Sequence, residues 1–349
     1  MGTTVTQADD LWLQFDAASA HAQAGRWAEA IPPYEALLRE AASNDLRAHV
    51  LNDLGVAYQS VGALDKALEY FQQAWDVYEA EKNRLGAAIA LGNLGTVHAQ
   101  RREWDAATYS LERSLTVFEN LQINNLAVAK LRMDMGDALA ATGQPKRASE
   151  QYTLALAQHE AAGDKRAMAL TLHALGAALR ARARWPEGID AFQRSAALFE
   201  ELGDAKNLAI TLNRLGELYY EQRDYEQAVE AYRRELKLSE QQKNQSAVAH
   251  ALNNLGLAYL GQKQFQEAAK QYRRAIALWQ KLGDEAGLAM ALWGRAQLHF
   301  EQDEAALALE EGTRALAILE RLESKEAGAV RKWLAAARRG KRTGLRRYF

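Results

Sequence analysis

The chain has 349 residues, a formal net charge of −2 from 43 basic and 45 acidic side chains, and no cysteine. Its composition, 48% hydrophobic and 25% charged, is that of an ordinary soluble folded protein. The absence of cysteine excludes disulfides, zinc–thiolate sites, iron–sulfur clusters and thiol catalysis. Four prolines favour long helices, and no apolar run reaches the length of about 18 residues that a membrane-spanning helix needs. No basic segment followed by an apolar stretch opens the chain, so a cytoplasmic location is predicted.

A small residue recurs along the chain at intervals of 40 residues in five cases, with one interval of 37 and one of 41. It is Gly or Ala, and it usually follows Leu: Ala18, Gly55, Gly95, Gly136, Gly176, Gly216, Gly256 and Ala296. Sixteen residues after it comes an aromatic or bulky residue in seven units: Tyr34, Phe71, Leu111, Tyr152, Phe192, Tyr232 and Tyr272. Such regular recurrence is the signature of a repeat architecture, and it predicts eight units in register.

Each unit is predicted to form two amphipathic helices, because apolar residues such as Leu51, Leu54 and Tyr58 recur at helical spacing. Helix stop and start signals stand together between units, with Gly for a left-handed C-terminal residue and Asp for an N-cap, at Gly163–Asp164, Gly203–Asp204 and Gly283–Asp284. We expect Asn83, Asn124 and Asn244 at the equivalent joints. A large residue near the start of most second helices is interpreted as packing: Trp27, Leu64, Trp104, Trp185, Tyr225 and Phe265.

Two units show the full pattern most clearly: Leu54-Gly55-Val56-Ala57-Tyr58 followed by Ala67, Phe71 and Ala74, and Leu255-Gly256-Leu257-Ala258-Tyr259 followed by Ala268, Tyr272 and Ala275. This pattern resembles the tetratricopeptide repeat family over roughly residues 10–320. The period of 40 exceeds the usual 34 or so, and the Pro that ends the second helix is missing, so a longer second helix is expected. The resemblance is closest to polarity scaffolds of the Pins type and to kinesin light chains.

The resemblance implies an all-α fold, a right-handed superhelical solenoid of about eight helix-turn-helix units with a C-terminal capping helix. We expect an N-terminal extension over residues 1–10, the repeat array over 11–322, the capping helix over 323–340 and a basic tail over 341–349. Val330 and Trp333 are expected to seal the end of the array. The atypical last repeat, with Ala296 for Gly and Gly312 for the aromatic residue, fits the position next to a cap.

Catalytic and metal sites are not predicted. The chain lacks the common nucleotide-binding, metalloprotease and serine-hydrolase motifs. His21, His98 and His299 occupy the repeat position of Tyr58, so they are interpreted as packing residues, and they lie too many repeats apart to share a metal. No catalytic residue, metal ligand or cofactor is therefore assigned, and the protein is predicted not to be an enzyme.

Binding residues are expected on the first helix of each unit, which the family resemblance places along a concave groove. The candidates for peptide binding, all expected to be solvent-accessible and to face this groove, are Asn52, Asn93, Asn213, Asn253, Asn254, Arg180, Arg214 and Tyr220. A carboxamide both donates and accepts, which suits the backbone of an extended peptide. The alternative is that these Asn side chains bond to a neighbouring helix and fix the repeat register. The groove is mixed in charge, with acidic residues at Asp53, Asp134, Asp137 and Glu217, and it lacks the Lys/Arg clamp of chaperone-binding family members.

The predicted function is a non-enzymatic scaffold or adaptor that binds an extended peptide or a partner-protein segment in its groove. An alternative is a peptide-sensing regulatory protein that controls a signalling partner. From Arg331 to Phe349 the chain has eight basic residues and no acidic one. This tail could bind nucleic acid or another anionic partner, or it could simply be a solvated terminus that complements the last helix dipole.

Overall fold

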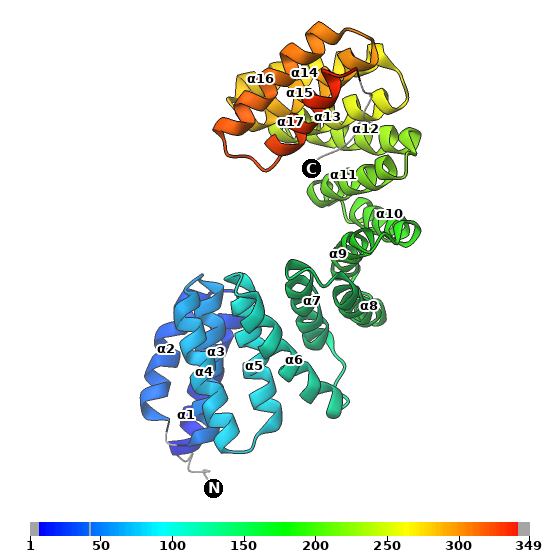
Figure 1. Cartoon of the computed structure of the whole chain (residues 1–349). Helices are drawn as coiled ribbons and strands as arrows, with labels where there is room; N and C mark the ends of the chain where they lie inside the picture. Colours follow the sequence, from blue (N-terminus) through cyan, green and yellow to red (C-terminus); the bar gives the residue numbers. More distant parts are fainter. Residues whose placement is uncertain (1–6, 42, 341–349) are drawn as a thin grey trace. The chain divides into compact units, whose positions relative to one another are not determined.

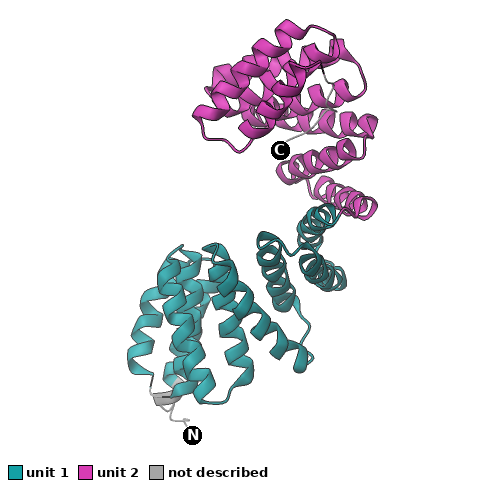
Figure 2. Cartoon of the chain, in the orientation of Figure 1, with its two compact units in different colours: residues 1–182 teal, residues 183–349 magenta. Residues whose placement is uncertain are grey.

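The computed structural model describes residues 7–41 and 43–340, and within these residues the chain is helical and contains no strand (Figure 1). The chain divides into two compact units, residues 1–182 and 183–349 (Figure 2). The first unit contains α1 (Gln7–Gln23), α2 (Trp27–Glu40), α3 (Asn44–Ser60), α4 (Leu64–Ala80), α5 (Arg84–Gln100), α6 (Trp104–Asn120), α7 (Leu126–Ala141), α8 (Pro145–Ala162) and α9 (Lys165–Ala181). The second contains α10 (Trp185–Glu201), α11 (Ala205–Glu221), α12 (Tyr225–Gln241), α13 (Gln245–Gly261), α14 (Phe265–Leu282), α15 (Glu285–Glu301), α16 (Ala305–Arg321) and α17 (Ala327–Ala337).

Odd-numbered helices up to α15 are the first helices of the repeats, and the even-numbered helices are the second. Within each unit every helix packs mainly on its neighbours in the sequence, as expected for a helical repeat array. The predicted all-α repeat fold is confirmed. The predicted boundaries at residues 10, 322 and 340 stay predictions: α1 begins at Gln7, α17 lies inside the predicted capping segment, and residues 341–349 lie outside the described part of the chain.

The recurrent small residue and the recurrent aromatic residue contact each other inside a helix pair. A Cβ on Gly55 would lie 2.5 Å from the Phe71 ring, and one on Gly216 would lie 2.5 Å from the Tyr232 ring. Any larger residue would therefore push the first helix away from the second. Phe71, Phe192 and Tyr272 are fully buried, which confirms the repeat register read from the sequence.

The joints between repeats confirm most of the expected signals. Gly163, Gly203 and Gly283 are left-handed, with φ of 67°, 66° and 70°. The side chains of Asp164, Asp204 and Asp284, like those of Asn83 and Asn244, each accept a hydrogen bond from an amide in the first turn of the next helix. Asn124 also lies in its joint, between α6 and α7, but it is not the N-cap. Asn125 caps α7 instead, because α7 begins ten residues before Gly136, one residue later than the other first helices begin before their small residue.

The C-terminal end of the second unit explains an irregularity of the last repeat. Trp333 and Leu334 of α17 lie over Gly312 of α16, where a Cβ would come within 2.7 Å of the Trp333 ring. Val330 and Trp333 are buried there, as expected. Gly312 thus replaces the usual aromatic residue because α17 covers this position in place of a further repeat.

Candidate functional site

A hollow of about 410 Å³ lies between α11 and α13 in the second unit, with α12 at its base. We call it the α11–α13 hollow. Most of its lining comes from the first helices of two consecutive repeats. The lining residues are Lys206, Ala209, Ile210, Asn213, Arg214, Glu217, Glu235, Ser239, Gln242, Asn244, Ala247, His250 and Asn254.

Two departures from the repeat pattern form the base of this hollow. Ser239 occupies a position where the first repeat has Ala41 but six other repeats carry a large residue: Tyr78, Phe118, His159, Phe199, Trp279 and Leu319. Glu235 occupies a position where the first repeat has Leu37 but the same six repeats carry a small residue: Ala74, Ser114, Ala155, Ser195, Ala275 and Ala315. The small serine leaves the space open, and the glutamate places a carboxylate in it. The repeat fold needs neither residue, since the other units form without them.

Polar contacts hold the side chains of the hollow. The Asn213 amide donates to both carboxylate oxygens of Glu235, at 3.1 Å each. Arg214 and Glu217 form an ion pair of 3.2 Å, in which Glu217 is buried and Arg214 is half-exposed. The Ser239 hydroxyl is buried and has no hydrogen-bond partner among the described residues. The base therefore offers a fixed acceptor at Glu235 and an unsatisfied hydroxyl beside it.

A second hollow of about 340 Å³ adjoins the first and shares His250 with it. Its lining includes Asn253, Trp279 and Asp284, and the Asn253 side-chain oxygen is buried without a hydrogen-bond partner in the described chain. The His250 ring packs edge-on against the Trp279 ring at 4.8 Å between centroids. Although part of the His250 ring reaches solvent, the surrounding groove walls desolvate it and lower its pKa.

The comparison with protein families matches the description "tetratricopeptide repeat" at residues 9–80, 86–161, 167–241 and 247–321, which together make up most of the chain. The chain belongs to the tetratricopeptide repeat family. A sequence comparison with curated proteins gives no match.

Solved structures of several other proteins are similar in fold. The apo form of RapI has 14% identity and a TM-score of 0.58, over 79% of this chain and 98% of that one. The apo form of the quorum sensor NprR from B. thuringiensis has 13% identity and a TM-score of 0.55, over 95% and 99%. A signal-transduction ATPase with a tetratricopeptide repeat sensor, from Pyrococcus horikoshii, has 16% identity and a TM-score of 0.65, over 88% of this chain but 46% of that one. At these identities the likeness concerns the fold.

The predicted binding residues of the second unit gather at the two hollows, with one exception. Asn213, Arg214 and Asn254 line the α11–α13 hollow, and Asn253 lines its neighbour. Tyr220 lines neither, and its ring instead contacts Tyr225 at 5.4 Å between centroids. The expectation that all of these side chains are solvent-accessible is wrong for three of them, since Asn253, Asn254 and Tyr220 are only 4%, 5% and 6% exposed. Neighbouring tetratricopeptide helices pack closely enough to cover them.

The predicted residues of the first unit are arranged differently. The Asn93 amide of α5 donates to the Asn52 side-chain oxygen of α3 at 2.9 Å, and the Asn52 amide donates to Asp53 at 3.3 Å. This bond joins the first helices of two successive tetratricopeptide repeats, which is the geometry that the register alternative requires. Arg180 is partly buried on α9. The structure thus brings together only part of the predicted set.

The acidic groove residues of the first unit also bond within the scaffold. Asp53 accepts from the Tyr34 hydroxyl at 3.1 Å, Asp134 accepts from the Thr96 hydroxyl at 2.7 Å, and Asp137 accepts from the Tyr152 hydroxyl at 2.6 Å. Desolvation raises the pKa of all three carboxyl groups. Their first role is therefore to tie first helices to their neighbours.

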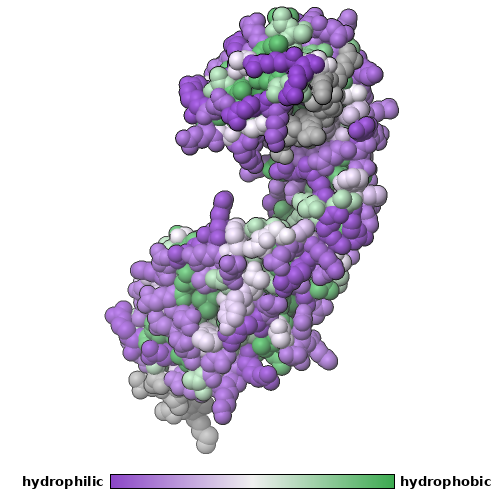
Figure 3. Space-filling view, viewed as in Figure 1, coloured by the Kyte–Doolittle hydropathy of each residue, from purple (hydrophilic) through white to green (hydrophobic). Residues whose placement is uncertain are grey.

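One groove position was missed by reasoning from the sequence. It lies six residues before the small residue, and it carries the exposed Ile89, Leu170 and Ile210 as well as His250. Apolar side chains that recur at an exposed position of the same helix face are the signal that could have revealed it. In Figure 3, hydrophobic patches likewise interrupt the mainly hydrophilic surface of each unit.

The histidines at the tyrosine position do more than pack. His98 lies 2.6 Å from Glu103, and His299 lies 2.5 Å from Glu304, at the start of the following helix in each case. Both rings are partly exposed, so the packing interpretation is corrected to a polar contact. The described residues include no group of three or more His, Asp or Glu side chains that could hold a metal ion. None of the described helices is long and apolar enough to cross a membrane.

Proposed function

We propose that this tetratricopeptide repeat protein acts without catalysis, by binding an extended peptide segment of a partner protein at the α11–α13 hollow. The observation that supports the proposal is the pair of departures at the base, Ser239 and Glu235. In the six other repeats that follow the first, the position of Ser239 carries a large residue and the position of Glu235 carries a small, neutral one. A scaffold that served only its own stability would gain from filling this space.

The walls of the hollow suit a peptide main chain with a small or medium apolar side chain. Apolar surface comes from Ile210, Ala209 and Ala247, and the exposed Ile210 side chain can contact the apolar side chain of the peptide. Asn213 and Glu235 supply hydrogen-bonding groups that are already oriented by their mutual bonds, which lowers the entropic cost of binding. Lys206 and the Arg214–Glu217 ion pair lie around them, so charge along the ligand would set its orientation.

The proposal is tested by selecting displayed random peptides against the protein and counter-selecting against Ser239→Phe. This variant restores the aromatic residue of the equivalent positions Phe118 and Phe199, so it fills the hollow while the fold is kept. We expect peptides that bind the natural protein and lose measurable affinity for Ser239→Phe. We further expect Asn213→Ala to weaken binding by about 1–3 kcal/mol in fluorescence anisotropy, because it removes a hydrogen-bond donor and loosens Glu235.

Two outcomes would contradict the proposal: selection that enriches no peptide, or peptides that bind Ser239→Phe as tightly as the natural protein. Asn52→Ala is the matched control. It removes a carboxamide of the same repeat position from the first unit, so it should leave the affinity of a hollow-dependent peptide unchanged.

The alternative of a peptide-sensing regulator stays a prediction, and it shares the binding step. A regulator should change shape when the selected peptide binds, whereas an adaptor should not. Small-angle scattering of the protein with and without the peptide separates the two, through a change in the radius of gyration. The cytoplasmic location and an anionic partner for the tail 341–349 also stay predictions.

A further inference from the structure

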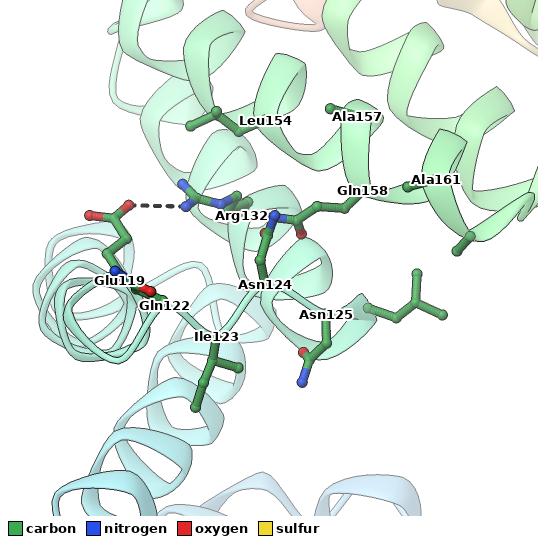
Figure 4. Close-up of a pocket in the computed structure, with 12 residues that line it drawn as sticks. Glu119, Gln122, Ile123, Asn124, Asn125, Arg132, Leu154, Ala157, Gln158 and Ala161 are labelled. Carbon is green, nitrogen blue, oxygen red and sulfur yellow. Dashed lines mark hydrogen bonds and ion pairs between the residues drawn. The ribbon is translucent and has the colours of Figure 1, made fainter.

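The first unit contains a further, larger hollow of about 740 Å³, which is open to solvent and lined by α6, α7, α8 and the joint between α6 and α7. We call it the α6–α8 hollow. It lies wholly in the first unit, so it is separate from the peptide site proposed above. Figure 4 shows Arg132 in its middle, with Glu119 on one side and Gln158 and Asn124 on the other.

Three features of the chain depart from the repeat pattern at this place. Arg132 stands four residues before Gly136, where six other repeats carry Leu: Leu51, Leu91, Leu172, Leu212, Leu252 and Leu292. Gln158 stands where six others carry an aliphatic residue: Val77, Val117, Leu198, Leu238, Leu278 and Ile318. The joint before α7, residues 121–125, has five residues where the other joints between repeats have two or three, and that added length places Asn124 and Asn125 at the edge of the hollow.

Arg132 is a cation placed in the interior. Its side chain is 8% exposed, and it forms an ion pair of 3.0 Å with Glu119, whose side chain is 57% exposed. A second guanidinium nitrogen donates to the Gln151 side-chain oxygen at 3.2 Å. The Nε atom has no hydrogen-bond partner in the described chain, and neither has the side-chain oxygen of Gln158, whose amide donates to Asn124. A buried guanidinium with an unused donor is expensive for the fold, so a ligand that used it would recover part of that cost.

The remaining lining is apolar and accessible. Leu126 and Leu154 are 48% and 45% exposed, and Ala157 and Ala161 follow Leu154 along α8 on the wall (Figure 4). A ligand seated here would thus place a charged group on Arg132 and an aliphatic body against α8. Arg132 and Glu119 are the charged residues of the lining, so their charges cancel before any ligand binds.

We propose that the α6–α8 hollow binds a carboxylate attached to a small aliphatic body, such as a free acylated amino acid or the C-terminal residue of a peptide. The planar guanidinium of Arg132 pairs with a carboxylate through two parallel hydrogen bonds, and the ligand takes the place of the more exposed Glu119 side chain. A single negative charge replaces a single negative charge, which favours a carboxylate over a doubly charged phosphate. The carboxamides of Asn124 and Gln158 supply further donors for its oxygens.

The test uses N-acetyl-L-leucine as the free carboxylate and N-acetyl-L-leucinamide as its uncharged match, with the full chain and NMR-detected titration. We expect saturable binding of the acid in the range of about 0.1–10 mM, and binding at least about tenfold weaker for the amide. Short peptides that end in leucine, with a free or an amidated terminus, form the second arm. Tighter binding of the free-ended peptide than of N-acetyl-L-leucine would indicate a peptide terminus, and the reverse would indicate a small molecule.

Three variants separate a binding role of Arg132 from a structural one. Arg132→Leu restores the residue of the other repeats, so we expect it to keep or raise the melting temperature and to abolish binding of the acid. Gln158→Leu should weaken binding while Arg132 stays in place. Glu119→Gln removes the competing carboxylate from an exposed position, and it should tighten binding by about threefold or more.

If Arg132 served only to hold α6 and α7 together through its ion pair with Glu119, Glu119→Gln would not bind the acid more tightly. The proposal is overturned if the natural protein shows no saturable binding of the acid or of the free-ended peptide. It is also overturned if acid and amide bind alike, or if Arg132→Leu binds as the natural protein does. Failure here would leave the peptide site of the second unit untouched, since the two sites share no residue.

Discussion

The Tyr152 hydroxyl donates a 2.6 Å hydrogen bond to the Asp137 carboxylate, and both groups are largely removed from water. Desolvation raises the pKa of each, with the nearby carboxylate adding to the effect on the tyrosine. At the equivalent position Phe71 forms the same ring contact without a hydroxyl. At the scale of the residue, then, the ring supplies the packing and the hydroxyl adds a bond to a groove carboxylate.

We predict that Tyr152→Phe lowers the unfolding free energy by about 1–2 kcal/mol, because it removes one hydrogen bond to a charged acceptor that water can partly replace. Urea denaturation measures the change. Tyr109→Phe is the control: that ring is 63% exposed, so its loss should cost less than about 0.5 kcal/mol. Equal effects of the two substitutions would show that the Asp137 bond contributes nothing.

A pH dependence follows from His250, whose pKa is lowered by desolvation and raised in smaller part by the Asp284 charge. The folded protein holds this ring neutral at a pH where the unfolded chain already binds a proton. The contribution of His250 to stability is therefore present above its ordinary pKa of about 6.5, and it is lost as the pH falls below that value. NMR titration of the ring, assigned with His250→Gln, should give a midpoint below about 6.5. A midpoint above it would refute the desolvated environment.

At the scale of the element, each repeat depends on one close approach of two helices. Gly216 of α11 has the Tyr232 ring of α12 where a Cβ would stand, at 2.5 Å. Gly328 of α17 is also helical, but it has open space at the same point. Substitutions at these two glycines therefore distinguish the steric requirement for glycine from the effect of helix propensity.

We predict that Gly216→Ala destabilises the second unit by about 1–3 kcal/mol, because the added methyl forces the ring or the helix aside. Gly328→Ala should instead be neutral or stabilising by up to about 1 kcal/mol, since alanine is the better helix former. Thermal unfolding followed by circular dichroism compares them. If Gly216→Ala unfolds no earlier than the natural protein, the close approach is not as tight as the structure has it.

At the scale of the whole molecule, stability is a sum of repeats and of the contacts between neighbours. Phe192 shows this within the second unit, where it is fully buried in one cluster with Leu215, Leu218 and Val229 of the next two helices. The cluster around Trp279 and Trp333, nearer the C-terminal end, does not include it. Damage at Phe192 should therefore remain partly local.

We predict that Phe192→Ala costs about 3–5 kcal/mol and that amide hydrogen exchange rises first in α10, α11 and α12. Protection in α15, α16 and α17 should persist longer under the same conditions. Uniform loss of protection through α17 would indicate that the second unit unfolds as a single cooperative block.

The sequence by itself determined the repeat, its register and most of its joints. A pattern that recurs about every 40 residues can be compared between repeats, which resolves positions that a single repeat would leave ambiguous. The packing of Gly55 against Phe71 and the helix joint at Gly203–Asp204 could therefore be predicted without coordinates. The cap at Asn125 escaped because α7 begins one residue later in its repeat than the other first helices, whereas the spacing from Gly136 points to Asn124. Such shifts are visible only when the N-cap hydrogen bond is seen.

Only the tertiary structure decided what the groove residues do. Asn52 and Asn213 occupy the same repeat position, yet the Asn52 oxygen accepts from Asn93 of the following first helix, whereas the Asn213 amide donates to Glu235 of its own second helix. Burial of Asn253 and Asn254 likewise depends on side chains from neighbouring helices, which the spacing along one helix does not contain. The sequence shows that four residues depart from the repeat pattern: Ser239, Glu235, Arg132 and Gln158. Only the structure shows that these residues line two hollows, because three helices meet at each hollow. Sequence periodicity reports which face of a helix is buried, whereas the space left between helices depends on every side chain that enters it.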